Sequence, residues 1–397
     1  MELKIKTEKI PDDQSVIVVS DLHLGLVKRE QASADFSDFL EFLKRLVPGG
    51  TGGNPEAMVN DKPKKLLAPA KIILLGDIVD LWSPRDNTRA SVFADSYPII
   101  QSLLAFPAEI VYVAGNHDDE ITEIEGSFPV SSPGKLTIIK RHYPDSLPGR
   151  DGIKKHSGIL IGNHRYFFMH GQQFDLLFNI MGLLQNYPGW VSKNYSLFRE
   201  HPRFKWLFWA LFGLSIVYLM LANIILRITT ILNGVMYFLL GLSMIIVLFS
   251  IEPTTFRSFW DGISLRKNTK TETIETIIEA GFWKKEAGDN ILADVVVFGH
   301  THIADDSKDR YLQIHHKRFI NSGSWGDEMM KTSDDRGVSE KNTFVYIDTE
   351  GPVLFRWPDK GPFPEQIRTT FTGDPARASP LTSPIKLWMR RNILTGG

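Results

Sequence analysis

Seven side chains that can bind metal ions follow short apolar runs of this chain. They are two aspartates, one asparagine and four histidines: Asp21, His23, Asp77, Asn116, His170, His300 and His302. Carboxylate, amide and imidazole groups are ligands that suit Mn, Zn, Fe or Mg. The chain has no cysteine, so disulfides and thiolate metal sites are excluded. We therefore expect a metal site in which oxygen and nitrogen atoms hold the cations.

The spacing of these residues fits shared cations. Asp21 and His23 are two positions apart, so in an extended chain their side chains point the same way and can hold one ion. Asp77 follows Gly76, a residue type that lets backbone and cation approach closely. The Asp77 carboxylate has two oxygens, so the seven ligands suffice for two ions that share it. Each residue alone has a plainer explanation, because a lone aspartate after a strand is usually a helix cap and a lone histidine is usually structural.

Five apolar runs are typical of buried strands: Val16 to Ser20, Lys71 to Leu75, Glu109 to Val113, Tyr166 to Met169 and Asp294 to Phe298. Their continuous apolar character favours strands covered on both faces, with helices between them. The spacing of apolar residues predicts helices over Ser33 to Leu46 and Thr271 to Lys285. The candidate ligands follow the carboxyl ends of the strands, where open α/β sheets bind their ligands.

Two further stretches are predicted to lack regular structure. Pro48 to Ala70 is rich in glycine, proline, asparagine and lysine, which favours a loop. Trp357 to Gly397 is predicted to be an extended tail. Within it, Ile385 to Leu394 mixes apolar and basic residues, so it is either a membrane contact or a solvated tail.

A long apolar segment lies between His170 and His300. Trp206 to Leu226 and Ile228 to Ile251 contain no charged residue, and each is long enough to cross a hydrocarbon core of about 30 Å. They predict a membrane hairpin. Basic residues precede and follow it, so both outer ends are expected on the cytoplasmic side. A buried hairpin of a soluble core, a hairpin that enters one leaflet, and an oligomerisation element are the alternatives.

The motifs around these residues resemble those of the calcineurin-like metallophosphoesterase superfamily. Its pattern is D-x-H, G-D-x-x-D, G-N-H-[DE], a lone H and G-H-x-H. Here the blocks are Asp21-Leu22-His23, Gly76-Asp77-Ile78-Val79-Asp80, Gly115-Asn116-His117-Asp118, His170 and Gly299-His300-Thr301-His302. The resemblance implies a four-layer α/β/β/α sandwich and two divalent cations, with Mn expected first and Zn, Fe or Mg as alternatives.

The resemblance also implies a role for each residue. One cation is expected on Asp21, His23, Asp77 and His302, and the other on Asp77, Asn116, His170 and His300. Two such cations lower the pKa of a bridging water and hold the phosphoryl oxygens for in-line attack of hydroxide at phosphorus. His117 stands outside the ligand set and is expected to donate a proton to the leaving oxygen. Asp118 is expected to orient the His117 imidazole.

Three stretches are similar to the UDP-2,3-diacylglucosamine pyrophosphatase branch of this superfamily: SDLHLG, GDIVDLW and FMHGQQFD. In that branch a cap between the lone histidine and G-H-x-H holds acyl chains. The apolar hairpin occupies the same interval here, although the insertion is larger and the C-terminal tail is extra. Arg85, Arg89 and Gln173 lie beside the metal motifs and either contact phosphate or head group or are solvated loop residues.

Together these patterns predict a catalytic domain over 1–190 and 271–356, an inserted helical cap over 191–270 with hairpin segments 206–226 and 228–251, and a C-terminal extension over 357–397. The predicted function is a membrane-anchored, metal-dependent phosphoester or pyrophosphate hydrolase. Its substrate would be a lipid-linked phosphate, and its catalytic domain would face the cytoplasm. A tethered phosphatase or phosphodiesterase of soluble nucleotides or phosphoproteins is the alternative, and a non-catalytic scaffold is a third hypothesis. The net charge of −1 gives no basic field for nucleic acid, so no such partner is expected.

Overall fold

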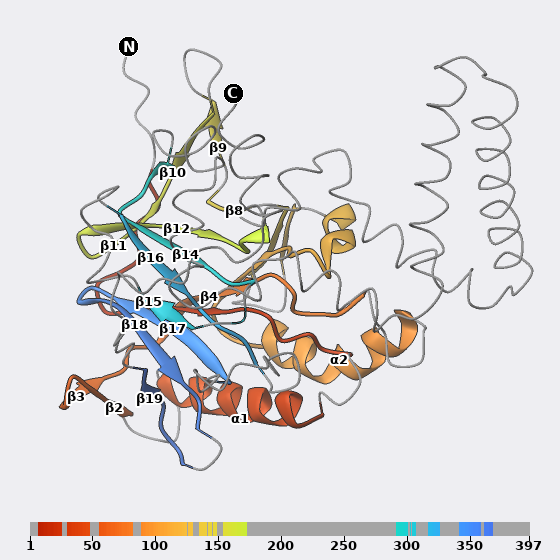
Figure 1. Ribbon diagram of the computed structural model, residues 1–397, viewed down its shortest axis with the longest axis horizontal. Coiled ribbons are helices and arrows are strands. Elements are labelled where there is room, and N and C mark those ends of the chain that lie inside the picture. Colours follow the sequence, from red (N-terminus) through yellow and green to blue (C-terminus); the bar gives the residue numbers. More distant parts are fainter. Residues whose placement is uncertain are drawn as a thin grey trace, which may run out of the picture. The chain divides into compact units, whose positions relative to one another are not determined.

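The computed structural model describes residues 7–25, 30–47, 55–81, 89–124, 126–129, 135–140, 142–144, 146–148, 154–172, 291–300, 302, 304–306, 317–325, 341–358 and 361–367 (Figure 1). They belong to one compact unit, formed by Met1–Gly182 and Asn268–Gly397. A second unit, Leu183–Lys267, lies outside the described residues. The boundaries of the inserted cap and of the C-terminal extension therefore stay predictions.

Among the described residues, the larger sheet has eight strands. In spatial order they are β19 (Glu365–Gln366), β18 (Gly351–Arg356), β17 (Thr343–Asp348), β1 (Ser15–Val19), β4 (Pro69–Leu75), β5 (Glu109–Val113), β7 (Lys135–Ile139) and β6 (Gly126–Pro129). The central strands β1, β4, β5 and β7 are parallel to their neighbours in this group. Their carboxyl ends therefore lie at one edge of the sheet.

The second large sheet contains β11 (Ile159–Ile161), β12 (His164–Met169), β14 (Val295–Phe298), β16 (Arg318–Asn321) and β15 (Asp305–Asp306), with β8 (His142–Tyr143) beside β12. Strands β12, β14 and β16 are parallel. Two small sheets accompany the large ones: β9 (Ser146–Pro148) with β10 (Lys154–Ser157) and β13 (Ile291–Leu292), and β2 (Glu56–Val59) with β3 (Lys62–Lys65). A short 3₁₀ helix, η1 (Asp119–Ile124), follows β5.

The two large sheets pack face to face, because alternate residues of each strand enter different cores. In β1, Val16 and Val18 lie in the core that the sheets share, together with Tyr166 of β12. Ile17 points the other way and packs in a second core with Phe39 of α1 (Glu30–Leu46). The helix α2 (Arg89–Leu104) contributes to the same second core, so both helices cover the outer face of the larger sheet.

Helix α1 forms because Phe36, Phe39, Leu40 and Leu43 recur at helical spacing and are all buried. The predicted helix Ser33 to Leu46 is confirmed, with three residues added at its start. The second predicted helix, Thr271 to Lys285, lies outside the described residues. The four-layer arrangement therefore stays a prediction.

All five predicted strands are present as β1, β4, β5, β12 and β14, with ends within two residues of those predicted. The loop predicted over Pro48 to Ala70 is wrong from Glu56 onward, because β2 and β3 form a hairpin there. Asn60 and Asp61 form its turn with φ values of 50° and 64°. Asparagine and aspartate tolerate this left-handed conformation, which two-residue hairpin turns require. Two elements near the site, α2 and β16, were not predicted.

In the part of the chain that the structure describes, no helix has the length and apolar character of a membrane span. The predicted hairpin segments, 206–226 and 228–251, lie outside that part, as does the basic stretch 385–394. The predicted tail is partly ordered, because Trp357 is buried and β19 pairs with β18.

A charged cluster at the amino-terminal ends of the central strands carries a pH prediction. Lys71 is buried and forms ion pairs with Glu109 and Glu8. Partial burial raises the pKa of Glu109, but Lys71 and Lys135 outweigh it and lower that pKa below its ordinary value of 4.5. A group whose pKa is lowered by folding stabilises the protein above its unfolded value, and this contribution disappears as the pH falls through the folded value.

We expect Glu109→Gln to lower the melting temperature at pH 7, and the difference from wild type to shrink as the pH falls below 4.5. Thermal unfolding followed by circular dichroism across pH 3–8 measures this. Glu41→Gln on the exposed face of α1 is the control, because in the described structure its carboxylate pairs with Lys44 at the surface. A difference between Glu109→Gln and wild type that stays constant with pH would contradict the assignment.

Candidate metal centre

The seven predicted ligands lie at the carboxyl ends of five strands from both large sheets. They are Asp21 and His23 after β1, Asp77 after β4, Asn116 after β5, His170 after β12, and His300 and His302 after β14. The parallel order of the strands puts these ends at the edge of each sheet. The backbone N–H of His300 donates to Asp21 Oδ2 at 3.0 Å, which joins the two edges.

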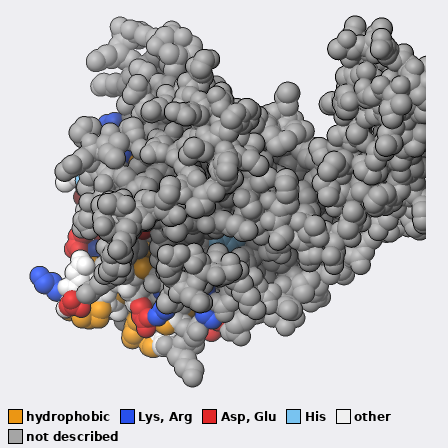
Figure 2. All heavy atoms as spheres, in the orientation of Figure 1, with side chains coloured by type: hydrophobic (Ala, Val, Ile, Leu, Met, Phe, Trp, Pro, Cys, Tyr) orange, Lys and Arg blue, Asp and Glu red, His pale blue; other side chains and the backbone are white. Residues whose placement is uncertain are grey.

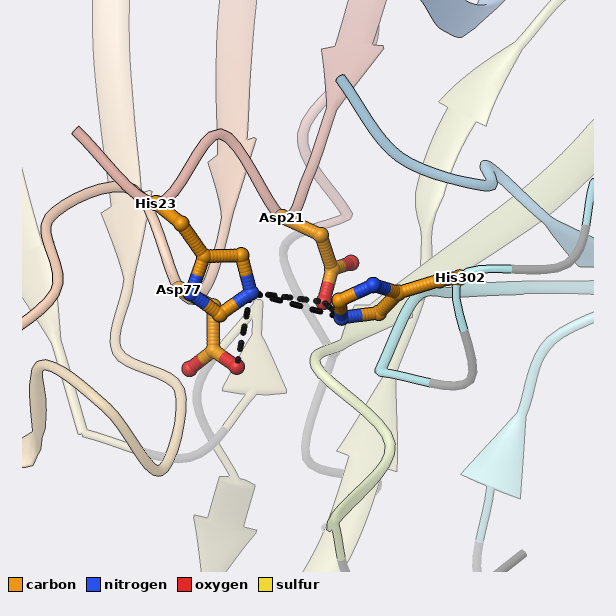
Figure 3. Close-up of side chains that lie close together, drawn as sticks. All are labelled: Asp21, His23, Asp77 and His302. Atoms are coloured by element: carbon orange, nitrogen blue, oxygen red, sulfur yellow. Dashed lines mark hydrogen bonds and ion pairs between the residues drawn. The ribbon is translucent and has the colours of Figure 1, made fainter. Parts of the chain in front are cut away.

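Four buried side chains form the first ligand group: Asp21, His23, Asp77 and His302. Their ligand atoms lie within 4.8 Å of one another. His302 Nε2 lies 3.1 Å from Asp21 Oδ1 and 3.3 Å from His23 Nε2. Figure 3 shows the four side chains converging from the loops after β1, β4 and β14. This is the set that the resemblance predicts for one cation.

The second ligand group contains Asp77, His170 and His300, all buried. His170 Nε2 lies 3.3 Å from Asp77 Oδ2, and the rings of His170 and His300 are 5.2 Å apart. His170 Nδ1 donates to the carbonyl of Leu75 at 2.8 Å, which leaves its Nε2 directed at the site. Asp77 is therefore a member of both groups, as expected for a carboxylate shared by two cations.

Glycines make this convergence sterically feasible. A Cβ on Gly76 would lie 2.3 Å from His170 Nδ1, and a Cβ on Gly115 would lie 2.3 Å from Asp77 Oδ1. On Gly299 it would lie 2.6 Å from Asp21 Oδ2. Each distance is far below a van der Waals contact. The glycine before the ligand in these three motifs is therefore required by the close approach of the neighbouring ligand.

The backbone at the ligands is strained. Asp21, His23, Asp77, His300 and His302 all have φ between 48° and 69°, a region that residues other than glycine seldom occupy. Each such residue costs on the order of 1 kcal/mol, and such conformations concentrate at functional sites. The strain turns side chains from both sheets toward one volume.

Buried polar atoms at this edge fit a cation. Asp21 Oδ1, Asp77 Oδ2, Asn116 Oδ1 and His170 Nε2 make no hydrogen bond within the described structure, although Asp21 Oδ1 lies near His302 and Asp77 Oδ2 lies near His170. A buried polar atom without a partner is costly, so it needs a ligand of opposite charge character. All four are lone-pair atoms of the kinds that divalent cations bind. The residues present therefore fit the two cations that the resemblance implies.

The electrostatics of the protein alone point the same way. Burial opposes the charge on Asp77, but His170 and His117 outweigh it and hold the Asp77 pKa well below its usual value. Burial likewise opposes a charge on His170, but Asp77 outweighs burial and raises the His170 pKa to about 9. A bound cation would take the place of that proton, since both neutralise the same carboxylate.

In the structure Asp80, and not Asp118, lies beside the His117 imidazole. His117 Nδ1 lies 3.1 Å from Asp80 Oδ2, and His23 Nδ1 lies 3.2 Å from the same oxygen. Burial alone would raise the Asp80 pKa, but the His117 and His23 imidazoles outweigh it and lower that pKa below its usual value. The carboxylate is therefore ionised and can only accept hydrogen bonds. Both histidines therefore carry a proton on Nδ1, which leaves their Nε2 atoms to face the site.

The Asp118 carboxylate contacts other groups. Its Oδ2 accepts from the N–H of Ile78 at 2.8 Å and from the hydroxyl of Tyr112 at 2.5 Å, and its Oδ1 accepts from the N–H of Gly115 at 2.6 Å. The Asp118 side chain thus points back between two loops. A motif of four consecutive residues does not reveal which neighbour each side chain faces, so the sequence alone could not separate Asp80 from Asp118.

The polar residues at the end of β16 also support the site, and they were not predicted from the sequence. The Ser322 hydroxyl, after β16, lies 2.8 Å from that of Ser20, after β1, and Asn321 Nδ2 donates to the carbonyl of Gly299 at 3.2 Å. These bonds fasten the β1 and β14 ligand loops together. The available signal was the short run Arg318 to Asn321 (RFIN), which is followed by polar residues like the other site strands.

The structure does not describe the side chains of the three predicted substrate contacts. Arg85 and Gln173 lie outside the described residues, and Arg89 is described only as the first residue of α2. Their roles stay predictions.

A substitution at Gly76 tests how tightly the site is built. We expect Gly76→Ala to weaken Mn²⁺ binding at least tenfold, because the added methyl group would displace His170 or Asp77. Isothermal titration calorimetry measures the affinity. Gly351→Ala is the matched control, since Gly351 also has a positive φ but its added Cβ would meet nothing within 4 Å. Equal Mn²⁺ affinity in the two variants would contradict this account of the site.

Comparison with known proteins agrees with this geometry. Residues 15–213 match the calcineurin-like phosphoesterase family, which covers half of the chain. The match includes the motifs after β1, β4, β5 and β12, while the motif after β14 lies beyond it and joins the site through the second sheet. No curated protein matches the chain. The chain belongs to the calcineurin-like phosphoesterase family, and it is a metal-dependent hydrolase of phosphoric ester bonds.

Proposed function

We propose that this hydrolase is anchored in a membrane by its apolar hairpin and cleaves a lipid-linked phosphate or pyrophosphate. The observation that carries the hydrolytic part is that Asp77 belongs to both ligand groups. The lipid part is supported by the two uncharged runs between His170 and His300. These runs come from the same interval as the acyl-binding cap of the UDP-2,3-diacylglucosamine pyrophosphatase branch.

The residues divide the chemistry among them. Two divalent cations, with Mn expected first, would supply Lewis-acid activation of water and neutralise the phosphoryl oxygens. Asp77, as a member of both ligand groups, would hold both cations. His117 is 8% exposed, whereas Asp21, His23, Asp77 and His170 are fully enclosed. His117 therefore reaches the surface of the site, and because its Nδ1 donates to Asp80, its Nε2 is the atom that would serve the leaving oxygen.

An exposed apolar face near the site fits an amphiphilic substrate. Phe93 and Tyr97 lie one turn apart on α2 and are 53% and 61% exposed. The first turn of α2 lies against the His23 loop, because a Cβ on Gly25 would be 2.7 Å from Val92 Cα. Exposed aromatic side chains beside a site often mark contact with an apolar partner. On the small part of the described surface that is coloured in Figure 2, hydrophobic, acidic and basic side chains are interspersed.

The membrane position follows from the same segment. The hairpin would keep the catalytic domain at the bilayer surface and raise its effective concentration toward a lipid substrate. Basic residues on both sides of the hairpin support a cytoplasmic location of the catalytic domain.

Two substitutions separate metal binding from proton transfer. We expect His117→Ala to lower turnover by about 10²- to 10⁴-fold while Mn²⁺ affinity stays near wild type. Asp77→Ala should lose both, because both ligand groups lose their shared carboxylate. Hydrolysis of bis(p-nitrophenyl) phosphate and Mn²⁺ calorimetry measure the two properties, with circular dichroism to verify the fold. Full activity in either variant would refute the mechanism.

The lipid substrate is tested by comparing amphiphilic and soluble substrates. The full-length protein is assayed on UDP-diacylglucosamine in detergent micelles and on UDP-glucose, with nucleotide release as the readout. We expect a strong preference for the lipid. The double variant Phe93→Ser/Tyr97→Ser should lower activity on the micelles by on the order of tenfold without changing hydrolysis of the soluble substrate UDP-glucose.

The matched control is Met58→Ser, because Met58 is also an exposed apolar side chain, at 56%, but lies on the β2–β3 hairpin. It should leave activity on the micelles unchanged. Equal activity on lipid and soluble substrates would exclude a lipid hydrolase and favour the tethered phosphatase or phosphodiesterase. A screen of nucleotides and phosphopeptides would then identify the substrate class.

A further inference from the structure

Tyr112 lies in a hydrophobic core, yet its hydroxyl makes a hydrogen bond to a carboxylate. It is the fourth residue of β5, is only 6% exposed, and packs among the apolar residues between the larger sheet and the helices. Its hydroxyl donates to Asp118 Oδ2 at 2.5 Å. Burial, together with the nearby Asp118 charge, raises the pKa of Tyr112 well above its usual value, so the phenol keeps its proton and acts as the donor.

The Asp118 carboxylate links two loops that carry predicted ligands. It accepts from the N–H of Ile78, the residue after Asp77, and from the N–H of Gly115, the residue before Asn116. One side chain therefore fixes the loop after β4 to the turn after β5. The same two loops are joined by the His117 N–H, which donates to Asp77 Oδ1 at 2.8 Å.

Tyr112 is the side-chain donor of this link. The other two donors to Asp118 are backbone groups of the loops themselves, so they move when the loops move. The Tyr112 hydroxyl comes instead from the interior of a strand that is paired on both sides, with Leu74 of β4 and Ile138 of β7. It ties the position of Asp118 to the rigid sheet. A buried carboxylate that loses a donor also becomes more costly to keep in place.

We propose that Tyr112 is a positioning residue for both cation sites: its hydroxyl, acting through Asp118, sets the positions of Asp77 and Asn116. This inference rests on the metal-dependent hydrolase and not on the lipid substrate. Groups that orient metal ligands from behind commonly contribute 10- to 100-fold in metal affinity or activity.

The test is Tyr112→Phe in the full-length protein, because this change removes the hydroxyl and keeps the ring. We expect the Mn²⁺ affinity measured by calorimetry to fall about 10- to 100-fold. Turnover of bis(p-nitrophenyl) phosphate should recover partly at saturating Mn²⁺, since the hydroxyl touches neither substrate nor ligand. The rise in melting temperature on adding Mn²⁺ should shrink as well, which gives a readout without substrate.

Tyr346→Phe is the matched control. Tyr346 is also a buried core tyrosine, and its hydroxyl accepts from the N–H of Leu67 at 2.9 Å, away from the ligand loops. This variant should lose stability without losing Mn²⁺ affinity. Unchanged Mn²⁺ affinity in Tyr112→Phe, or an equal loss in both variants, would overturn the proposal.

A double-mutant cycle with Asp118→Asn tests the route. If Tyr112 acts through Asp118, adding Tyr112→Phe to the Asp118→Asn variant should change Mn²⁺ affinity much less than it does in the wild type. The same fold-change in both backgrounds would overturn the route through Asp118. A failure of lipid hydrolysis with these binding results intact would count against the proposed substrate alone.

Discussion

The shared carboxylate of Asp77 is the constraint on which the rest of the structure depends. Its Oδ1 accepts from the His117 N–H, and its Oδ2 faces His23, His170 and His117 at 3.3–4.0 Å. A carboxylate fully enclosed among imidazoles is stable only with positive charge beside it. The surrounding structure therefore supplies this charge and fixes the geometry. The glycines make room, the left-handed backbone turns the ligands inward, and Asp80 and Asp118 secure the loops from behind.

The two supporting aspartates, Asp80 and Asp118, have different roles because they contact different groups. Asp80 lies against the imidazoles of His23 and His117, which lowers its pKa and keeps it an acceptor. Asp118 lies deeper. Its burial and the Asp77 charge outweigh its hydrogen bonds and raise its pKa to about 6 in the protein alone. One aspartate therefore controls the protonation of the histidines, while the other organises backbone.

Much of the site could be predicted from the sequence, because each ligand follows an apolar run that forms a strand, and parallel strands collect their carboxyl ends. The strands β1, β4, β5, β12 and β14 were predicted because each is a short, continuous apolar run. Other features depend on contacts between distant segments. The pairing of Ser20 with Ser322 and the direction of Asp118 have no local signature. Helix α2 has few charges and a proline at position 98, so its sequence lacks a clear helical pattern. The β2–β3 hairpin could have been inferred from Asn60-Asp61.

The pairing of β12 with β14 has a consequence for how such a protein can change over time. His170 and His300 follow adjacent strands, although 129 residues separate them in the sequence. The hydrogen bonds between Tyr166–Phe168 and Val295–Val297 set the distance between the two histidines, so the connecting chain does not. The entropy of closing a loop rises only slowly with its length. The interval can therefore gain or exchange an entire module without altering the ligand geometry.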